Sequence, residues 1–585
     1  MPTLHLRRAC LLVSILLSAA AASAQPSGGP YGPIDRVYKI PKAAHVTYVA
    51  PDGDAAAPGT TLKQPTSIEA AIAKAKTGDA IILRGGVYRT GGLTFNQGIT
   101  LQPYAGERPV LKGTEVATDW QAAGEHVWKT AWSKLFPAAP LAWWNRKKEE
   151  ARTPLHRFNN DMVFVDGVFL QSAGSVAELT PQTYYIDYPN HEVYIGTDPA
   201  GHTVEITAHD GALIRTSLPV HGKVADHKGP AIRGLTITGY ARRCIEIEGK
   251  KQFGPNDEPT NEPVGPSDPK TYGKEAVGTL LENDSISYCS RVAGWFRGDG
   301  LVIRNTLVSD TSTEGIYVIG SSNVLIERNI IRRNNIEQLT GYYPSAVKIF
   351  NQTHHVVLRD NLVLDNPNSN GVWFDVGNRD GVFANNYVEG ALVGFMFEIS
   401  RGVTVTGNVF AHNGKGVWIL NSADARVAGN TFYDNPAAFM RTERSAAGDL
   451  FDWHPATGPG VEQREGHVFT GNLLVASAGY RDPLLRFEQS PAVCSRLTRP
   501  QAGKIDGNVY VREAAATKLI LWTPGDGPDC TAAFSSLAAF RRAVPQFEKH
   551  GKQLDRTARS LFKAPDIGRF ELRSPLAAGA YPFKR

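Results

Sequence analysis

The chain has no apolar segment long enough to span a membrane as a helix. A short apolar stretch at about 11–17 follows a basic pair at 7–8 and precedes a small-residue triplet at 22–24. These features in this order are the pattern of a secretory signal peptide. We therefore predict that residues 1–24 form a signal peptide cleaved after Ala24. The mature protein is then soluble in the periplasm or outside the cell, without a membrane partner.

The sequence also lacks an excess of charge of one sign. It has 62 Lys and Arg against 57 Asp and Glu, a formal net charge of +5, and no basic block. Removal of the leader lowers this charge further, because the leader carries two arginines. Nucleic-acid-binding proteins show basic patches or runs, so this class is excluded.

Cysteine is scarce, with five residues in 585. One lies in the leader, and the spacing of the other four does not match a zinc site. In an oxidising compartment, Cys244–Cys289 and Cys494–Cys530 are plausible disulfides. Four cysteines allow three pairings, and the sequence does not choose among them.

What the sequence does contain is an internal repeat. From about residue 280 an asparagine recurs ahead of an apolar pair, at intervals of 22, 24, 32, 25, 22 and 22 residues. A second apolar element, starting with Gly or Ala, repeats in register with it. A period in the low twenties with short alternating strands predicts a solenoid. The asparagines are Asn283, Asn305, Asn329, Asn361, Asn386, Asn408 and Asn430.

The second element predicts which side chains face inward. Alternation places Val372 and Phe374 inside the coil, and Trp373 and Asp375 outside it. The equivalent inward pairs on the other coils are all apolar. Successive coils stack about 4.8 Å apart as parallel sheets. We expect the recurrent asparagines to form a buried ladder of side-chain amides with a structural role.

The ends and the repeat together resemble a known superfamily. The entry strand at 47–53, a short helix from Ser67, the strand at 80–88, the segment 99–114 and the closing segment 571–579 accompany the asparagine coils. This combination resembles the pectate-lyase-like superfamily of right-handed parallel β-helix proteins. It implies an all-β right-handed parallel β-helix with an N-terminal capping helix. The superfamily contains lyases, glycoside hydrolases, epimerases, esterases and adhesins, so the fold does not fix the reaction.

The predicted divisions follow from these patterns. Residues 25–114 form the N-terminal cap and first coils, 115–225 a small antiparallel β insertion, 226–480 the central coils and 481–585 the C-terminal coils and cap. The insertion resembles the small β-sandwich-like insertion of some β-helix glycoside hydrolases. The Pro- and Gly-rich segment 251–275 is a loop that leaves one coil.

The chemistry is expected on the outward positions. Asp375 and Glu398 are 23 residues apart at equivalent places on adjacent coils, so their backbones lie roughly 5 Å apart. Two like charges this close repel, and the pKa of at least one should rise. Glycoside hydrolysis needs such a pair, one as acid and one as nucleophile or base. The aromatic rings of Tyr317, Trp373 and Trp418 suit a sugar-binding groove.

Three alternatives remain open. Asp375 could pair with Arg379 or Lys348, and Glu398 with Arg401, as surface salt bridges. A polysaccharide lyase or epimerase could use Lys348 as its base, with the two carboxylates binding calcium. A non-catalytic glycan-binding surface protein is the third class.

The sequence therefore favours an exported glycoside hydrolase of a polysaccharide or oligosaccharide. Asp375 and Glu398, with Lys348, carry the chemistry, and the three aromatic residues line the groove. No metal site and no cofactor are implied, although calcium is possible. We expect a monomer.

Overall fold

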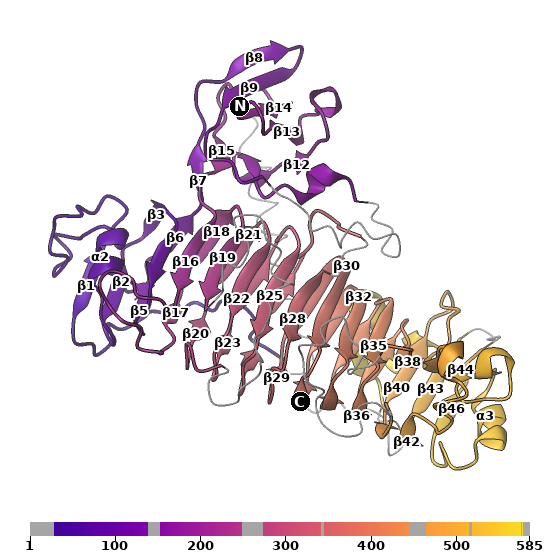
Figure 1. Cartoon of the computed structure of the whole chain (residues 1–585). Coiled ribbons are helices and arrows are strands. Elements are labelled where there is room, and N and C mark those ends of the chain that lie inside the picture. Colours follow the sequence, from indigo (N-terminus) through magenta and orange to yellow (C-terminus); the bar gives the residue numbers. More distant parts are fainter. Residues whose placement is uncertain are drawn as a thin grey trace.

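The computed structural model describes residues 28–137, 153–248, 273–340, 344–444, 464–513, 518–574 and 576. The chain winds into a parallel β-helix whose coils stack along one long axis (Figure 1). Each coil contributes one strand to each of three faces. The predicted β-helix is confirmed, and the insertion stands beside it as a separate lobe.

The first face is a 13-stranded parallel sheet. Its strands are β1 (Val46–Val49), β2 (Ala80–Leu83), β5 (Thr100–Pro103), β17 (Ala231–Arg233), β20 (Leu280–Glu282), β23 (Val302–Arg304), β26 (Leu325–Glu327), β29 (Val357–Arg359), β31 (Arg379–Ala384), β33 (Arg401–Thr406), β36 (Ala423–Ala428), β39 (His467–Thr470) and β42 (Ala502–Asp506).

The second and third faces are joined because two long strands, β30 (Leu362–Asp375) and β32 (Tyr387–Glu398), continue around the corner between them. The other strands of the second face are β3 (Gly86–Arg89), β6 (Pro109–Lys112), β18 (Thr236–Tyr240), β21 (Ser285–Cys289), β24 (Leu307–Ser309), β27 (Ile330–Arg332), β34 (Val409–Ala411), β37 (Thr431–Tyr433), β40 (Leu473–Ala476), β43 (Val509–Arg512) and β46 (Lys552–Leu554). Those of the third face are β4 (Leu93–Phe95), β16 (Gly211–Arg215), β19 (Arg243–Ile247), β22 (Val292–Phe296), β25 (Glu314–Ile319), β28 (Ser345–Phe350), β35 (Lys415–Leu420), β38 (Ala437–Arg441), β41 (Leu485–Gln489) and β44 (Ile520–Trp522).

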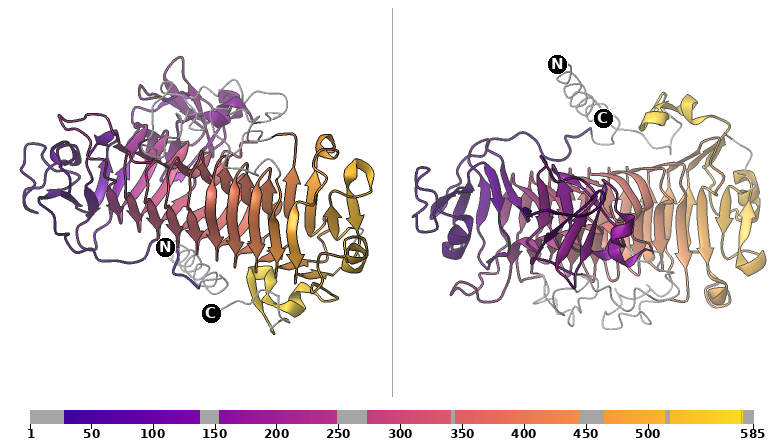
Figure 2. Two further views of the ribbon diagram at one scale, coloured as in Figure 1. Left: turned by 60° about the horizontal axis from the view of Figure 1, so that its bottom comes forward. Right: turned by 90° about the horizontal axis from the view of Figure 1, so that it is seen from above.

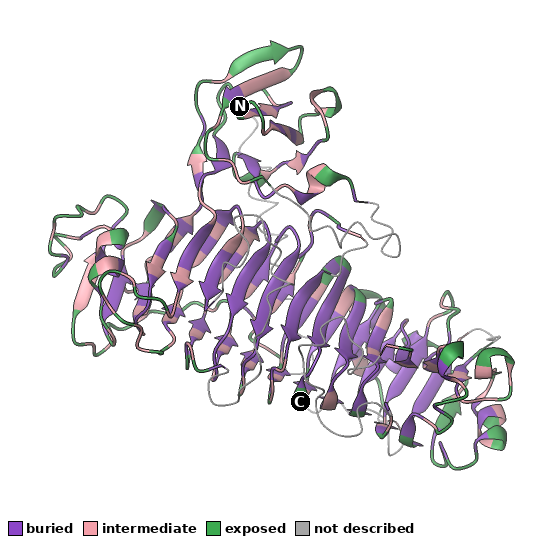
Figure 3. Ribbon diagram, viewed as in Figure 1, coloured by how far each residue is buried: buried purple, intermediate pink, exposed green. Residues whose placement is uncertain are grey.

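The core fills the inside of the coils. The predicted inward pairs are buried in one continuous cluster that runs through the stack, so the alternation gave the correct side for each of them. They are Ile316, Val318, Val347, Ile349, Val372, Phe374, Phe395, Phe397, Val417 and Ile419. Figure 3 shows the buried strands as an unbroken series along the stack, whereas the tip of the lobe is exposed.

The asparagine ladder exists, but its first two members are different from those predicted. Each side chain from Asn329 to Asn508 donates its Nδ2 to the Oδ1 of the next, at 2.9–3.1 Å. Earlier in the stack Asp284 and Thr306 occupy this position. Asn283 and Asn305 stand one residue before it, with positive φ of 65° and 48°. They take the left-handed turn that Gly407 and Gly429 form on later coils.

Both ends of the stack are covered. At the N-terminal end α2 (Ile68–Lys74) buries its apolar side against the first coil, and Ser67 caps it by accepting from the backbone N–H of Ala70. At the C-terminal end α3 (Leu537–Ala543) packs beside β45 (Ala532–Phe534). The chain then folds back through α4 (Ala558–Leu561), β47 (Phe562–Ala564) and β48 (Arg569–Leu572) onto the outside of the second face, which Figure 2 shows from two sides.

Two disulfides link neighbouring elements. Cys244 of β19 bonds Cys289 of β21, and Cys494 bonds Cys530. Of the three pairings that the sequence allowed, the structure has the one between near neighbours. Among the described residues, no helix is long and apolar enough to cross a bilayer. The predicted signal peptide, residues 1–24, lies outside the described residues.

The lobe leaves the stack at the corner between the second and third faces, after β6 (Figure 1). It contains one sheet of β7 (Thr114–Val116), β10 (Val163–Val165), β11 (Val168–Phe169) and β15 (Val204–Thr207). The other sheet contains β8 (Gln121–Gly124), β9 (Val127–Ala131), β12 (Gln171–Ser172), β13 (Thr183–Asp187) and β14 (Glu192–Ile195).

The two sheets of the lobe enclose their own apolar cluster. The insertion ends earlier than the predicted boundary at 225, because β16 already pairs with β4 and β19 of the stack.

Candidate functional site

The predicted register of the two acids is present in the structure. Asp375 at the end of β30 pairs with Glu398 at the end of β32, on adjacent coils of the third face. Both lie one residue beyond an inward phenylalanine, so both side chains leave the outer surface of the sheet. On the preceding coil, Phe350 is aligned with Asp375. Two residues earlier along the same strands, at the next outward position, Lys348 is aligned with Trp373. The third face therefore brings two carboxylates and one ammonium together.

Each carboxylate has a cationic partner. The Nζ of Lys348 lies 3.2 Å from Oδ2 of Asp375 and 3.8 Å from the centre of the Trp373 ring. The Nη1 of Arg444 donates to Oε1 of Glu398 at 3.2 Å. Lys348 was one of the two partners considered for Asp375. For Glu398 the expected partner Arg401 is wrong, since Arg401 pairs with Asp424 on the first face.

The acid pair is more enclosed than an open surface groove. Asp375 is 7% exposed and Glu398 is 3% exposed. Arg444, whose side chain keeps 37% of its accessible surface, stands between Glu398 and solvent. The Oδ1 of Asp375 is buried and has no hydrogen-bond partner among the described residues. A buried polar atom without a partner costs about 1–3 kcal/mol, so stability alone does not account for this carboxylate.

Tyr317 is not available for stacking on a sugar. It is fully buried in an apolar cluster outside the coil, against Trp295 and Phe350, and its hydroxyl donates to Glu314 at 3.2 Å. The prediction that Tyr317 lines the groove is therefore wrong. The alternation of the strand predicts the correct outward side for Tyr317, but it does not predict the layer of side chains that covers this residue.

The two tryptophans differ in exposure. Trp373 is nearly buried beneath the Lys348 ammonium and beside Val393 and Met396. Trp418 keeps part of its surface, with the Nζ of Lys415 4.5 Å from its ring centre. Of the three aromatic residues predicted to line the groove, Trp418 is the one that is only partly buried.

The backbone is strained directly after each acid. Val376 has φ of 42° and Ile399 has φ of 43°. The preceding and following coils place Gly320, Asn351 and Asn421 at this turn, residues that tolerate positive φ better than β-branched ones do. Such strain costs on the order of 1–3 kcal/mol per residue and tends to gather at functional sites. It fixes where the chain leaves β30 and β32, and with that the direction of both acids.

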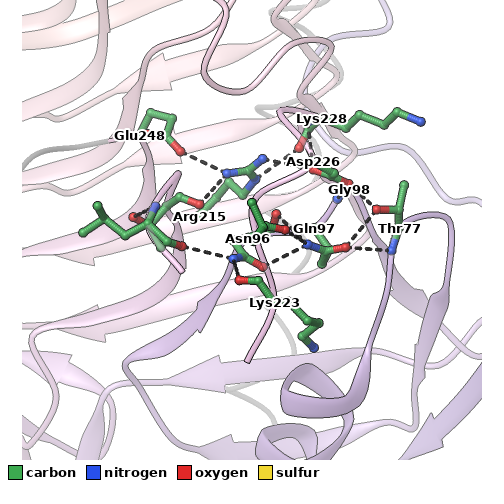
Figure 4. Close-up of polar contacts among 12 residues, drawn as sticks. Thr77, Asn96, Gln97, Gly98, Arg215, Lys223, Asp226, Lys228 and Glu248 are labelled. Atoms are coloured by element: carbon green, nitrogen blue, oxygen red, sulfur yellow. Dashed lines mark hydrogen bonds and ion pairs between the residues drawn. The ribbon is translucent and has the colours of Figure 1, made fainter. Parts of the chain in front are cut away.

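A second group of buried charges lies in the first coils (Figure 4). The guanidinium of Arg215 bonds Asp226 at 3.1 Å and Glu248 at 3.0 Å, and its Nε donates to the carbonyl of Lys228. Burial raises the pKa of Glu248 to about 7. These groups satisfy one another and attach the loop at 216–228 to the stack, so we assign them a structural role.

The sequence analysis missed several residues of interest. Arg444 follows Glu398 by 46 residues on an irregular segment, and no periodic signal marks it. Glu337 and Arg157 meet between the stack and the lobe. Among the described residues, no group of three or more His, Cys, Asp and Glu side chains is arranged to hold a metal ion. The part of the predicted loop at 251–272 lies outside the described residues.

Comparison with known proteins supports the fold. Residues 228–432 match the family model described as a right-handed β-helix region. No curated protein matches the chain. A solved structure of XylC in complex with xylose is similar over 82% of this chain and 88% of that one, with a TM-score of 0.50 and 15% identity.

Other similar structures are a glycoside hydrolase and a lacto-N-biosidase from Eubacterium ramulus. The first has a TM-score of 0.47 and 11% identity over 68% of this chain and 95% of that one. The second has a TM-score of 0.35 and 11% identity over 88% of this chain and 67% of that one. At such identities the likeness concerns the fold alone. This chain therefore has the fold of a right-handed parallel β-helix.

Proposed function

We propose that this chain is an exported glycoside hydrolase that cleaves a polysaccharide or oligosaccharide with Asp375 and Glu398. The observation that carries the proposal is the pairing of these two acids in register on adjacent coils. The unpartnered Oδ1 of Asp375 and the strained turns after both acids add to it. The names of similar structures, which include XylC with xylose and a glycoside hydrolase, are consistent with it.

The contacts support a different role for each acid. The Nζ of Lys348, itself nearly buried, lies against Oδ2 of Asp375 and holds this carboxylate in place, which suits a nucleophile or a base that activates water. Glu398 faces Arg444, a partner that solvent reaches and screens more strongly. We give Glu398 the remaining role, that of the general acid which protonates the leaving oxygen.

The same contacts argue against the lyase alternative. The Nζ of Lys348 is held 3.2 Å from Oδ2 of Asp375, so a lysine base would have to leave this contact to reach the proton of a substrate. Calcium binding by the two acids would require both to exchange their present cationic partners for the metal. Proton abstraction by Lys348 and calcium binding would thus both break present contacts of the acids, whereas hydrolysis uses the two acids at their paired positions.

The test is a screen of the purified mature chain against a panel of polysaccharides. A hydrolase releases reducing ends without new ultraviolet absorbance, a lyase releases unsaturated sugars that absorb, and a binding protein does neither. We expect Asp375→Asn and Glu398→Gln each to lower turnover at least about a thousandfold while the fold is kept. The matched controls Asp424→Asn and Glu327→Gln change acids on the first face and should keep full activity.

The proposal fails if both site variants keep wild-type turnover on a substrate that the chain degrades. Export is tested separately, by the N-terminal sequence of the secreted protein. Our proposal requires that it begin at residue 25.

A further inference from the structure

A cavity of about 640 Å³ lies between the lobe and the third face, away from the acid pair. The lobe contributes η3 (Leu155–Phe158), β12 and the start of β13, and the stack contributes the segment 336–340 and Asn368. The side chains of interest are His156, Arg157, Gln171 and Glu337. Its volume lies within the range of small-molecule sites, about 300–1,000 Å³.

The walls of this cavity are held in place by direct bonds between lobe and stack. Arg291, next to β22, donates to the carbonyl of Phe158 and to Oδ1 of Asn160, both at 2.8 Å. On the other side the backbone N–H of Thr340 donates to the hydroxyl of Thr153 at 2.7 Å. The lobe is thus fixed to the stack on two sides, and the cavity is a preformed feature.

Glu337 is the central polar group of the cavity. Its side chain is 3% exposed, and burial raises its pKa to about 7. Arg157 at 3.4 Å and Gln171 both donate to the same oxygen, Oε2. The other oxygen, Oε1, accepts no hydrogen bond from a described residue. The cavity therefore has a carboxyl oxygen with free hydrogen-bonding capacity on a nearly buried side chain.

The lining suits a neutral, hydroxyl-rich ligand. Arg157 and Gln171 supply donors, Glu337 supplies an acceptor, and Thr340 and Asn368 can do both. Arg157 is already paired with Glu337, Glu178 adds a further carboxylate to the lining, and burial lowers the pKa of His156. Among the described residues of the lining, the one arginine is thus engaged, and a carboxylate-bearing sugar would face like charge.

The cavity shares one strand with the acid pair. Asn368 lies on β30, the strand that ends at Asp375, and precedes Asn370, where β30 begins to pair with β28 on the third face. Asn370 and Asp375 are five residues apart, or roughly 17 Å of extended strand. A single sugar cannot reach across this distance, but an oligosaccharide can.

We propose that this cavity is a distal subsite that binds a neutral sugar ring of the chain whose cleavage occurs at Asp375 and Glu398. The inference rests on the proposed function in taking the ligand to be a carbohydrate chain. Glu337 accepts a hydrogen bond from a ring hydroxyl through Oε1, and Arg157 and Gln171 orient it through Oε2.

Binding is measured by calorimetry on the full mature chain carrying Asp375→Asn, which prevents cleavage. The probes are neutral xylo-, manno- and gluco-oligosaccharides and oligogalacturonates, each as dimer and hexamer. We expect a neutral hexamer to bind, and Glu337→Gln to weaken its binding at least about tenfold, a loss of about 1.4 kcal/mol. Gln171→Ala should give the same result, and the dimer should bind equally in all variants.

Glu327→Gln is the matched control, because it makes the same change on the first face of the same coil. In the active chain, Glu337→Gln should raise KM for the hexamer about tenfold and leave kcat on an aryl monoglycoside unchanged. The inference is overturned if no neutral hexamer binds, if Glu337→Gln binds the hexamer as the control does, or if both substrates lose rate equally. Failure of the proposed function shows separately, as hydrolysis of the aryl glycoside by the Asp375→Asn chain.

Discussion

Replacing Lys348 with methionine tests how much the ammonium group next to Asp375 contributes to stability. Methionine keeps the apolar stem of the side chain and removes the ammonium. Both partners are nearly buried, with 8% and 9% of their side-chain surface exposed. Removing one member of a buried ion pair leaves the other charge uncompensated and costs about 3–5 kcal/mol. The lost contact with the Trp373 ring adds about 1 kcal/mol.

We expect the Lys348→Met chain to be less stable than wild type by at least about 3 kcal/mol at pH 7. Adding Asp375→Asn to Lys348→Met should recover much of the stability, since it removes the unpaired charge. The measurement is the denaturant midpoint of each variant at pH 7.

Lys129→Met in the lobe is the control. Its pair with Glu192 is shorter, at 2.7 Å, but solvent reaches both side chains, so the midpoint should hardly change. Two results refute the reasoning. One is equal loss in the control and in Lys348→Met, and the other is a double variant no more stable than Lys348→Met alone.

Three further predictions concern the fold. Burial raises the pKa of Glu337 to about 7 and that of Asp161 to about 6, so the native state binds more protons than the unfolded state between about pH 4 and 7. Stability should therefore fall as pH rises through this window, and Glu337→Gln should flatten the dependence of the thermal midpoint. Asn408→Ala removes four hydrogen bonds inside the ladder and should cost at least about 3 kcal/mol in chemical unfolding. Reduction of the disulfide between β19 and β21 should lower the thermal midpoint, because it frees a loop of 45 residues.

The register of the coils could be predicted from sequence because a one-residue shift would turn every inward side chain to the outside. Val372 and Phe374 fix this choice on one coil, and four other coils agree with it. The position of Asp375 beside Glu398 then follows without any further information. The first two ladder positions could not be assigned, since Asn283 and Asn305 each stand next to another hydrogen-bonding residue, and local pattern does not say which one turns inward.

The contacts around the two acids could not be predicted from the sequence. Arg444 reaches Glu398 from an irregular segment, and Tyr317 is covered by side chains of neighbouring coils. Contacts of this kind depend on how the outer layer packs, which has no period in the sequence. The cavity around Glu337 was missed for the same reason, because its two walls come from the lobe and from the stack.

The separation between inside and outside explains why the acid pair points to function. The residues at inward positions are determined by the need to fill the interior of the coil. The asparagine ladder is determined by the need of backbone groups in the turns for hydrogen-bond partners. Neither requirement applies to the outward positions. The fold therefore does not need the energetic costs found there, which come from two stacked acids, a buried oxygen without a partner and two β-branched residues at positive φ. These costs fall on the same two coils, at one edge of the third face, and Glu337 lies near the opposite edge of that face. A carbohydrate chain that crosses the face would contact both, so the third face is where substitutions should change the length of chain that the protein prefers.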